Sequence, residues 1–208
     1  SLTGAQAANY TLTVQSAATA RITPKTVTLL ASKTYDGTTG LTGYVTVGGT
    51  IGSEVLGYSA AAANDSHVGT LGKYISAIAL ADVGSGATAG LASNYSLPVL
   101  NAANAPVTIT AKALTVSGTS VTTRAYDGTT VASLTGGTLN GAVTGDTLVL
   151  TQTGAFASKD YSSSAIGVTA TSTFSVGSTT NGSVQGDYAI TAPTGLSGFI
   201  TKKAPPVA

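Results

Sequence analysis

The chain has 208 residues, of which 42% are hydrophobic and 8% are charged, and its formal net charge is +1. A high apolar content with so little net charge argues against intrinsic disorder. No basic stripe or acidic tail is present, so we expect no nucleic-acid partner. Cysteine is absent, which excludes disulfide scaffolds, thiolate metal sites and thiol catalysis. No apolar run reaches the roughly 18 residues that span a bilayer, so we expect no membrane insertion.

An internal repeat organises the chain. The pentapeptide at residues 35–39, Tyr-Asp-Gly-Thr-Thr, recurs letter for letter at residues 126–130, which gives a period of 91 residues (126 − 35). The flanking segments at 22–29 and 109–116 also correspond. A period of this length is the size of a small β domain, whereas solenoidal β-helices repeat over much shorter segments. The period therefore predicts two consecutive domains.

Residues 1–24 resemble the end of a further repeat. A tyrosine strand closes each repeat, at Tyr95 and Tyr188, and a similar segment contains Tyr10. We therefore divide the chain into closing strands of a preceding partial repeat (1–24), a first repeat (25–111), a second repeat (112–203) and a tail (204–208). Residues 1–21 are expected to fold onto the first repeat, to belong to a truncated neighbour, or to pair with another molecule by strand addition.

Short alternating runs rich in Thr, Val, Ile and Tyr predict β-strands; they cover 26–30, 44–47, 107–110, 114–117, 147–151 and 188–191. Gly, Asn and Asp separate these runs. The only helix-tolerant stretches are 60–63 and 77–81, and we interpret the first as a loop or short turn. The expected fold is all-β: tandem antiparallel Ig-like β-sandwich repeats that form an elongated rod.

The repeated pentapeptide is either a ligand site or a structural corner, and a structural turn is the favoured interpretation. Asp followed by Gly favours a tight turn, because Gly accepts a positive φ and Asp bonds its own local backbone. The tyrosine is expected to bury its ring and to give its hydroxyl to a nearby carbonyl. The predicted turn residues are Tyr35, Asp36, Gly37, Tyr126, Asp127 and Gly128.

The sequence contains few candidate residues for catalysis or metal binding. His67 is the single histidine, and Asp65 and Ser66 precede it, but adjacent residues in a loop rarely form a triad. Glu54 and Asp146 occupy equivalent positions before a strand, which indicates turn chemistry more than a catalytic pair. No calcium-loop pattern is present. We expect no enzyme activity, no cofactor and no metal.

Two further kinds of surface site are candidates. Four tyrosines outside the repeated positions could face a ligand such as a host or matrix glycan: Tyr44, Tyr58, Tyr74 and Tyr161. Glycosylation sequons occur throughout this Ser- and Thr-rich chain, and the two that lie outside presumed strands are Asn64 and Asn181.

The repeated text resembles the YDG-type repeat of very large bacterial surface proteins of the filamentous-haemagglutinin type. The resemblance rests on Tyr-Asp-Gly-Thr-Thr, on Leu-Thr-Gly-Gly-Thr-Leu at 134–139, on Gly-Asp-Thr-Leu at 145–148 and on Ile-Thr-Lys-Lys at 200–203. It covers residues 22–203, and the first repeat departs from the pattern after Gly49. The resemblance implies a secreted, cell-surface, adhesion-associated protein whose repeats form a stalk, with no catalytic residues.

We therefore expect non-catalytic stalk repeats of a secreted bacterial surface adhesin or extracellular fibre, which support adhesion, aggregation or biofilm cohesion. Their expected partners are neighbouring repeats of the same polypeptide. The alternatives are a carbohydrate- or surface-binding module that uses the four tyrosines, and a fibre subunit that polymerises with other copies through residues 1–21.

Overall fold

The computed structural model describes residues 3–86 and 88–205. They form many short strands joined by loops, and helix is limited to three short 3-10 turns: η1 (Ala7–Asn9), η2 (Ala92–Asn94) and η3 (Gln185–Asp187). Each 3-10 turn comes directly before a tyrosine, at positions 10, 95 and 188. The expected all-β class is confirmed.

The first group of strands lies between residues 25 and 110, and we call it the first unit. A three-stranded sheet has the order β3-β2-β7, β4 pairs with β5, and β1 pairs with β6. Along β2, buried and exposed residues alternate, as expected of a strand with one face on a core. The strands are β1 (Lys25–Thr26), β2 (Thr28–Thr34), β3 (Val45–Gly48), β4 (Gly57–Ala63), β5 (Ile75–Ala81), β6 (Tyr95–Ser96) and β7 (Val107–Thr110).

The second unit comprises the strands between residues 112 and 201. Its largest sheet has the order β11-β14-β15-β17, a second has the order β13-β8-β16, and β9 and β10 pair with β12 and β18. The strands are β8 (Lys112–Ser117), β9 (Ser120–Val121), β10 (Arg124–Ala125), β11 (Val131–Ala132), β12 (Leu134–Thr135), β13 (Thr138–Asn140), β14 (Asp146–Phe156), β15 (Ile166–Thr179), β16 (Tyr188–Thr191), β17 (Leu196–Gly198) and β18 (Ile200–Thr201). Among the described residues, strands of one unit pair only within that unit.

The expectation of purely antiparallel sheets is wrong. Among the strands of the described residues, four pairs are parallel, namely β1 with β6, β2 with β7, β8 with β16 and β10 with β18. In every one of them an early strand of a unit pairs with a late one. The chain enters each unit at one end and leaves it at the other, so its first and last strands run in the same direction.

The alanine-rich stretches at 60–63 and 77–81 are strands, and the loop expected at 60–63 is a second error. They lie in β4 and β5, which pair antiparallel with register shifts near Ala62. Ala60 takes a positive φ of 51° at this irregularity. Ala61 and Ala63 are buried. Packing against the core therefore overrides the weak β-propensity of alanine.

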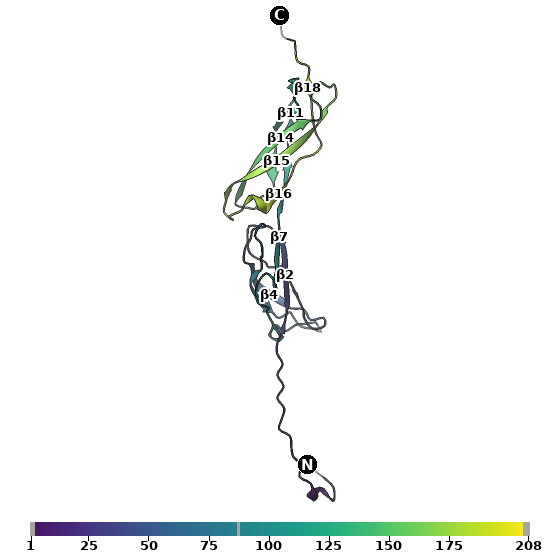
Figure 1. Cartoon of the computed structure of the whole chain (residues 1–208), viewed down its shortest axis with the longest axis vertical. Coiled ribbons are helices and arrows are strands. Elements are labelled where there is room, and N and C mark those ends of the chain that lie inside the picture. Colours follow the sequence, from purple (N-terminus) through teal and green to yellow (C-terminus); the bar gives the residue numbers. More distant parts are fainter. Residues whose placement is uncertain (1–2, 87, 206–208) are drawn as a thin grey trace.

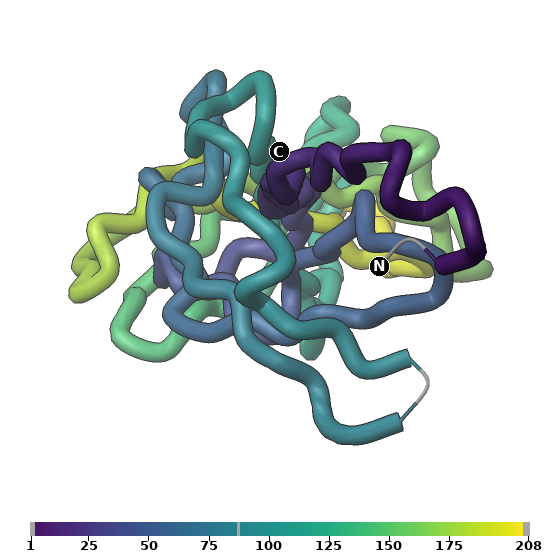
Figure 2. Tube along the Cα trace, turned by 90° about the horizontal axis from the view of Figure 1, so that it is seen from below, coloured from purple at the N-terminus to yellow at the C-terminus, as the bar shows by residue number. Residues whose placement is uncertain are grey.

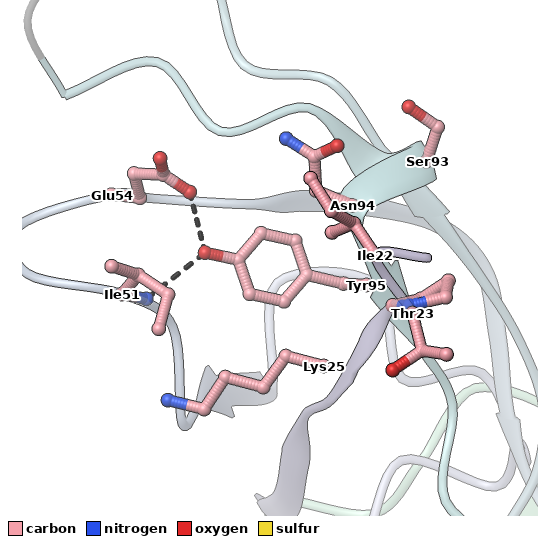
Figure 3. Close-up of a pocket in the computed structure, with 9 residues that line it drawn as sticks. Ile22, Thr23, Lys25, Ile51, Glu54, Ser93, Asn94 and Tyr95 are labelled. Carbon is pink, nitrogen blue, oxygen red and sulfur yellow. Dashed lines mark hydrogen bonds between the residues drawn. The ribbon is translucent and has the colours of Figure 1, made fainter. Parts of the chain in front are cut away.

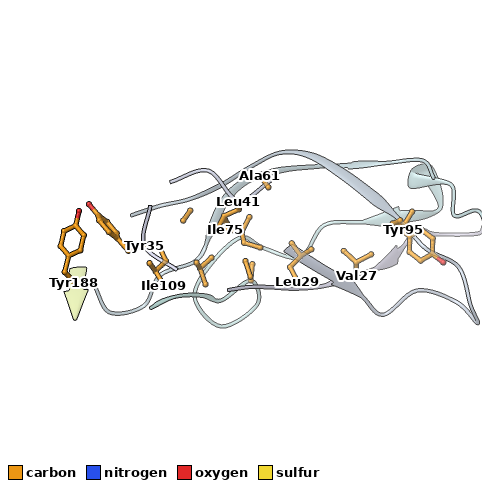
Figure 4. Close-up of a cluster of buried hydrophobic side chains, with 14 of the residues drawn as sticks. Val27, Leu29, Tyr35, Leu41, Ala61, Ile75, Tyr95, Ile109 and Tyr188 are labelled. Carbon is orange, nitrogen blue, oxygen red and sulfur yellow. The ribbon is translucent and has the colours of Figure 1, made fainter. Parts of the chain in front are cut away.

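A continuous apolar core runs through the first unit and into the second. Figure 4 shows the buried side chains in a row from Tyr95 to Tyr35, with Tyr188 of the second unit beyond. The cluster also contains Leu114 and Phe174 of the second unit. A separate cluster of Ala132, Phe156, Val168 and Ile200 fills the far part of the second unit. The apolar core therefore extends across both units, although the strands pair only within each unit.

The two units follow each other along the longest axis of the chain (Figure 1), and they overlap in projection when viewed along that axis (Figure 2). One residue, Ala111, separates β7 from β8. Residues 10–24 extend away from the first unit, and no strand forms in the segment around Tyr10. Tyr10 is 71% exposed there, whereas Tyr95 and Tyr188 are buried. The segment around Tyr10 therefore differs in burial from the closing strands at Tyr95 and Tyr188 that it resembles in sequence.

Candidate functional site: a polar cluster between the two units

The first YDG turn (residues 35–39) is built around a carboxylate and a buried lysine. Asp36 Oδ1 accepts hydrogen bonds from the backbone N–H and the hydroxyl of Thr38, both at 2.9 Å. Lys33 donates from Nζ to Asp36 Oδ1 at 2.7 Å and to two loop carbonyls, those of Thr38 and Gly40. Burial tends to raise the pKa of Asp36, but these hydrogen bonds outweigh it and lower the pKa. Asp36 thus bonds its own local backbone, and Gly37 takes a positive φ of 81°.

The second YDG turn (residues 126–130) repeats this construction with arginine. Asp127 Oδ1 accepts from the backbone N–H and the hydroxyl of Thr129, and Arg124 takes the place of Lys33. The hydrogen bond from the Thr129 backbone, followed by that of Arg124, lowers the pKa of Asp127 to about 2. Both turns are thus held by a cation three residues before the aspartate.

The tyrosines of the two YDG turns have different surroundings. Tyr35 is buried, and its hydroxyl shares a hydrogen bond of 2.6 Å with Ser183 Oγ of the second unit. Its ring packs edge to face on Tyr188. Tyr126 is only partly buried, and Lys159 Nζ lies 5.9 Å from its ring centroid. The hydroxyl of Tyr35 therefore reaches the next unit instead of the nearby carbonyl that the sequence predicts.

Asp187 is the fully buried acidic residue of this junction. Its carboxylate accepts from Val68 N at 2.8 Å and from Val184 N at 2.9 Å, and it pairs with His67 Nδ1 at 2.8 Å. The side chain of Asp187 is fully buried, so each of these donors offsets part of the cost of removing the carboxylate from water. His67 also stacks on Tyr35, with ring centroids 6.4 Å apart. A loop of the first unit is thereby held on the second.

Asp146 gathers the hydroxyl groups on the second-unit side. Burial alone would raise the pKa of Asp146, but the donated hydrogen bonds outweigh burial and lower it; the donors are Ser183, Thr179, Tyr188 and Asn181. Burial, followed by the hydrogen bond to Asp146, raises the pKa of Tyr188 to about 12. Val143 N donates to the Tyr188 hydroxyl at 3.2 Å. We call Tyr35, His67, Asp146, Ser183, Asp187 and Tyr188 the junction cluster.

The opposite end of the first unit carries a similar arrangement, which neither of the two described units covers. The Tyr95 hydroxyl donates to Glu54 and accepts from Ile51 N at 2.9 Å, as Tyr188 does with Asp146 and Val143. These groups line a hollow of about 470 Å³ together with residues 22–25, Ser93 and Asn94 (Figure 3). We call it the N-terminal hollow. The hydrogen bond to Glu54 raises the pKa of Tyr95.

The four tyrosines singled out as ligand-facing do not line the N-terminal hollow. Tyr44 and Tyr161 are about half exposed, in different units, and Lys202 Nζ lies 4.9 Å from the Tyr161 ring centroid. Tyr58 is partly buried, and its hydroxyl accepts from Val45 N. Tyr74 is partly buried, and its backbone forms an isolated antiparallel β-bridge with Pro106. The structure does not bring these rings together in one groove.

The two sequon asparagines differ in exposure. Asn64 is exposed, and its side-chain oxygen accepts from Tyr74 N. Asn181 is partly buried, and its amide nitrogen donates to Thr144 O at 3.0 Å and to Asp146. A Cβ at Gly37 would stand 2.9 Å from Asn181 Cγ. Asn181 is therefore part of the contact between the units.

Asp65, Ser66 and His67 do not form a catalytic triad. Asp65 Oδ1 accepts from the backbone N–H of His67, and the His67 ring pairs with Asp187 instead. In the part of the chain that the structure describes, no group of three or more His, Asp or Glu side chains is placed to hold a metal ion. No helix among the described residues has the length and apolar character needed to cross a membrane.

The family comparison covers the second unit and its side of the junction. Residues 110–195 match the family model described as YDG domain, and this range includes the second YDG turn, Asp146, Ser183, Asp187 and Tyr188. Residues 110–195 form a YDG domain. Comparison with curated proteins and with solved structures gave no match. The YDG domain thus supplies the half of the junction cluster that receives the first YDG turn.

Several residues of the YDG turns and of the junction cluster are not predicted from the sequence. Lys33 and Arg124 each stand two residues before the repeated tyrosine, so their common spacing (124 − 33 = 91) was a usable signal. Asp187 could have been noticed as a charged residue directly before a core tyrosine. Nothing in the sequence marks Ser183, because its role depends on a partner 148 residues away.

Proposed function

We propose that this chain is a structural stalk segment of a secreted bacterial surface adhesin or extracellular fibre, with no catalytic role. Consecutive β units dock end to end, hold each other in a fixed orientation as an elongated rod, and present or space an adhesive part. The YDG domain at 110–195 and the resemblance of the remaining sequence to such repeats support the proposal.

The single observation that carries the proposal is the junction cluster. Ala111 alone links β7 to β8, and Tyr35 and His67 of the first unit are seated on Ser183, Tyr188 and Asp187 of the second. A short connection together with buried, hydrogen-bonded side chains restricts hinge motion between units. Because these polar groups bond to one another, they suit a joint better than a substrate site.

Small-angle scattering and rotational diffusion of the full chain test the stiffness. Tyr35→Ala with His67→Ala should loosen the joint, so that the two units tumble more independently and the scattering shows shorter average dimensions. The matched control is Tyr126→Ala with Asp160→Ala, which should leave both measurements unchanged. Tyr126 repeats Tyr35, and Asp160 corresponds to His67, because Asp160 N donates to Ser158 Oγ as His67 N donates to Asp65 Oδ1. Independent tumbling of the units in the unchanged chain would contradict the proposal.

The adhesive role needs a cellular test. The parent protein, with the loosening pair of substitutions in this segment, should be displayed on the bacterial surface in the same amount but support less aggregation or attachment. The control pair should behave like the unchanged protein. Unaltered aggregation with the loosened joint would show that stiffness at this joint is not what the adhesin needs.

A further inference from the structure

The N-terminal hollow is built like the surface that the second unit offers to the first. Tyr95, Glu54 and Ile51 form the same hydrogen bonds as Tyr188, Asp146 and Val143. The turns also agree, since Glu54 N donates to Ile51 O and Asp146 N donates to Val143 O, each at 3.0 Å. In the second unit this surface is covered by the first YDG turn and the His67 loop.

Residues 1–23 match the end of the second unit without a gap, at a constant offset of 178 (188 − 10 = 200 − 22 = 178). Both Gly4 and Gly182 have a positive φ, and a 3-10 turn precedes the tyrosine in both. The burial differs. Ile22 is 97% exposed, whereas Ile200 is fully buried, and Tyr10 is 71% exposed against 5% for Tyr188. The exposed residues are the ones that a β unit of this kind places in its core.

We propose that the N-terminal hollow is a docking socket for the YDG turn of a further β unit of this type, whose last strands are residues 10–23. The inference rests on the proposed function and adds the partner and the contact to it. The partner resembles the second unit, because residues 10–23 have the spacing of 188–201, while the first unit has two additional residues between its tyrosine and isoleucine (109 − 95 = 14).

The polar groups suit this partner. The loop at 157–167 corresponds to the His67 loop, since Asp160 N donates to Ser158 Oγ just as His67 N donates to Asp65. If a unit like the second one docks at the socket, its Asp160 takes the place that His67 of the first unit takes at the junction cluster. The socket presents Asn94 where the second unit has Asp187. An amide can donate to the incoming carboxylate, whereas an aspartate would repel it.

Joining residues 112–178 directly to Ser1 of the full chain tests the docking, because this fusion keeps the offset of 178. The added segment should fold together with residues 10–23. The backbone amides of residues 10–23 should then exchange at least about 100-fold more slowly than in the unextended chain. An added segment that stays unfolded, or unchanged exchange at 10–23, would overturn the proposal.

Contact at the socket is tested by disulfide crosslinking between introduced cysteines, since the chain has no cysteine of its own. Asn94→Cys, combined with Asp160→Cys in the added segment only, should give an intramolecular disulfide on mild oxidation. Asn94→Cys with Thr173→Cys in the added segment, on an exposed strand position, should not. His67→Cys with Asp187→Cys calibrates the reaction at the existing junction. If that pair crosslinks and the socket pair does so no faster than the Thr173 control, the socket assignment is wrong.

The two proposals fail separately. A stiff joint at the junction cluster, combined with an added unit that folds but tumbles freely, would overturn the docking socket and leave the stalk function standing. Free motion at the junction cluster itself would remove the basis of both.

Discussion

Tyr35 and Tyr188 meet edge to face at the boundary between the units, with ring centroids 5.6 Å apart and planes inclined by 77°. One is the first residue of a YDG turn, and the other is the closing tyrosine of the following unit. A pair in this geometry contributes about 0.5–1.5 kcal/mol beyond the area it buries. The two most conspicuous tyrosine motifs in the sequence are therefore the two sides of one contact.

Removal of the Tyr35 hydroxyl should weaken the junction. Ser183 donates to Asp146, so Tyr35 supplies the proton of the bond between Tyr35 and Ser183. Tyr35→Phe should cost about 1–2 kcal/mol of unfolding free energy, because Ser183 Oγ loses a buried donor. The matched change Tyr126→Phe, at a partly exposed ring, should stay within about 0.5 kcal/mol. Urea titration followed by near-ultraviolet circular dichroism measures both, and equal effects would refute the asymmetry.

The glycines of the two YDG turns should respond differently to alanine. Gly37 and Gly128 have nearly the same φ, +81° and +82°, so both substitutions carry a similar backbone strain of about 1–2 kcal/mol. Only at Gly37 does the new Cβ collide with a neighbouring unit, 2.9 Å from Asn181 Cγ. Gly37→Ala should therefore destabilise the chain by more than Gly128→Ala. A larger effect at Gly128 would mean that the close contact does not exist in solution.

Asp187 should not tolerate the loss of an acceptor oxygen. Asp187→Asn turns an NH₂ group toward at least one of the N–H donors around the carboxylate, which should cost about 1–3 kcal/mol. His67→Ala removes only one donor and should cost less. The control is Asn94→Asp at the equivalent, exposed position of the first unit, with an effect within about 0.5 kcal/mol. Denaturant midpoints that rank the three variants otherwise would contradict the burial of Asp187.

Acidic pH should destabilise the folded chain through the protonation of Asp146. The pKa of Asp146 is lowered in the folded state, so the unfolded chain binds a proton more readily and stability is lost as the pH falls below about 4. Asp146→Asn removes this group, so it should give a less stable chain whose unfolding free energy depends less on pH in that window. Chemical denaturation between neutral and acidic pH checks the slope. An unchanged slope in the variant would show that Asp146 is not the responsible group.

Much of the fold could be predicted from local sequence. Repetition of the pentapeptide gave the period, and alternating β-branched residues located strands such as β7 and β16. Asp36 and Asp127 both accept a bond from the backbone two residues ahead, a contact that depends only on nearby residues of the chain. The YDG domain at 110–195 matches the more specific part of the resemblance. The error at 60–63 arose because alanine has little preference of its own, and burial against the core decides its conformation.

The sequence by itself therefore determined the β character, the repeat length and the two YDG turns, since each depends on neighbours in the chain. Tertiary structure alone decided that strands at the two ends of a unit run parallel, that Tyr35 bonds to Ser183 and that His67 pairs with Asp187. The parallel pairs join strands about 70 or more positions apart within one unit. The two side-chain contacts join residues 120 or more positions apart, and their energies depend on burial at a surface that exists only after both units have folded.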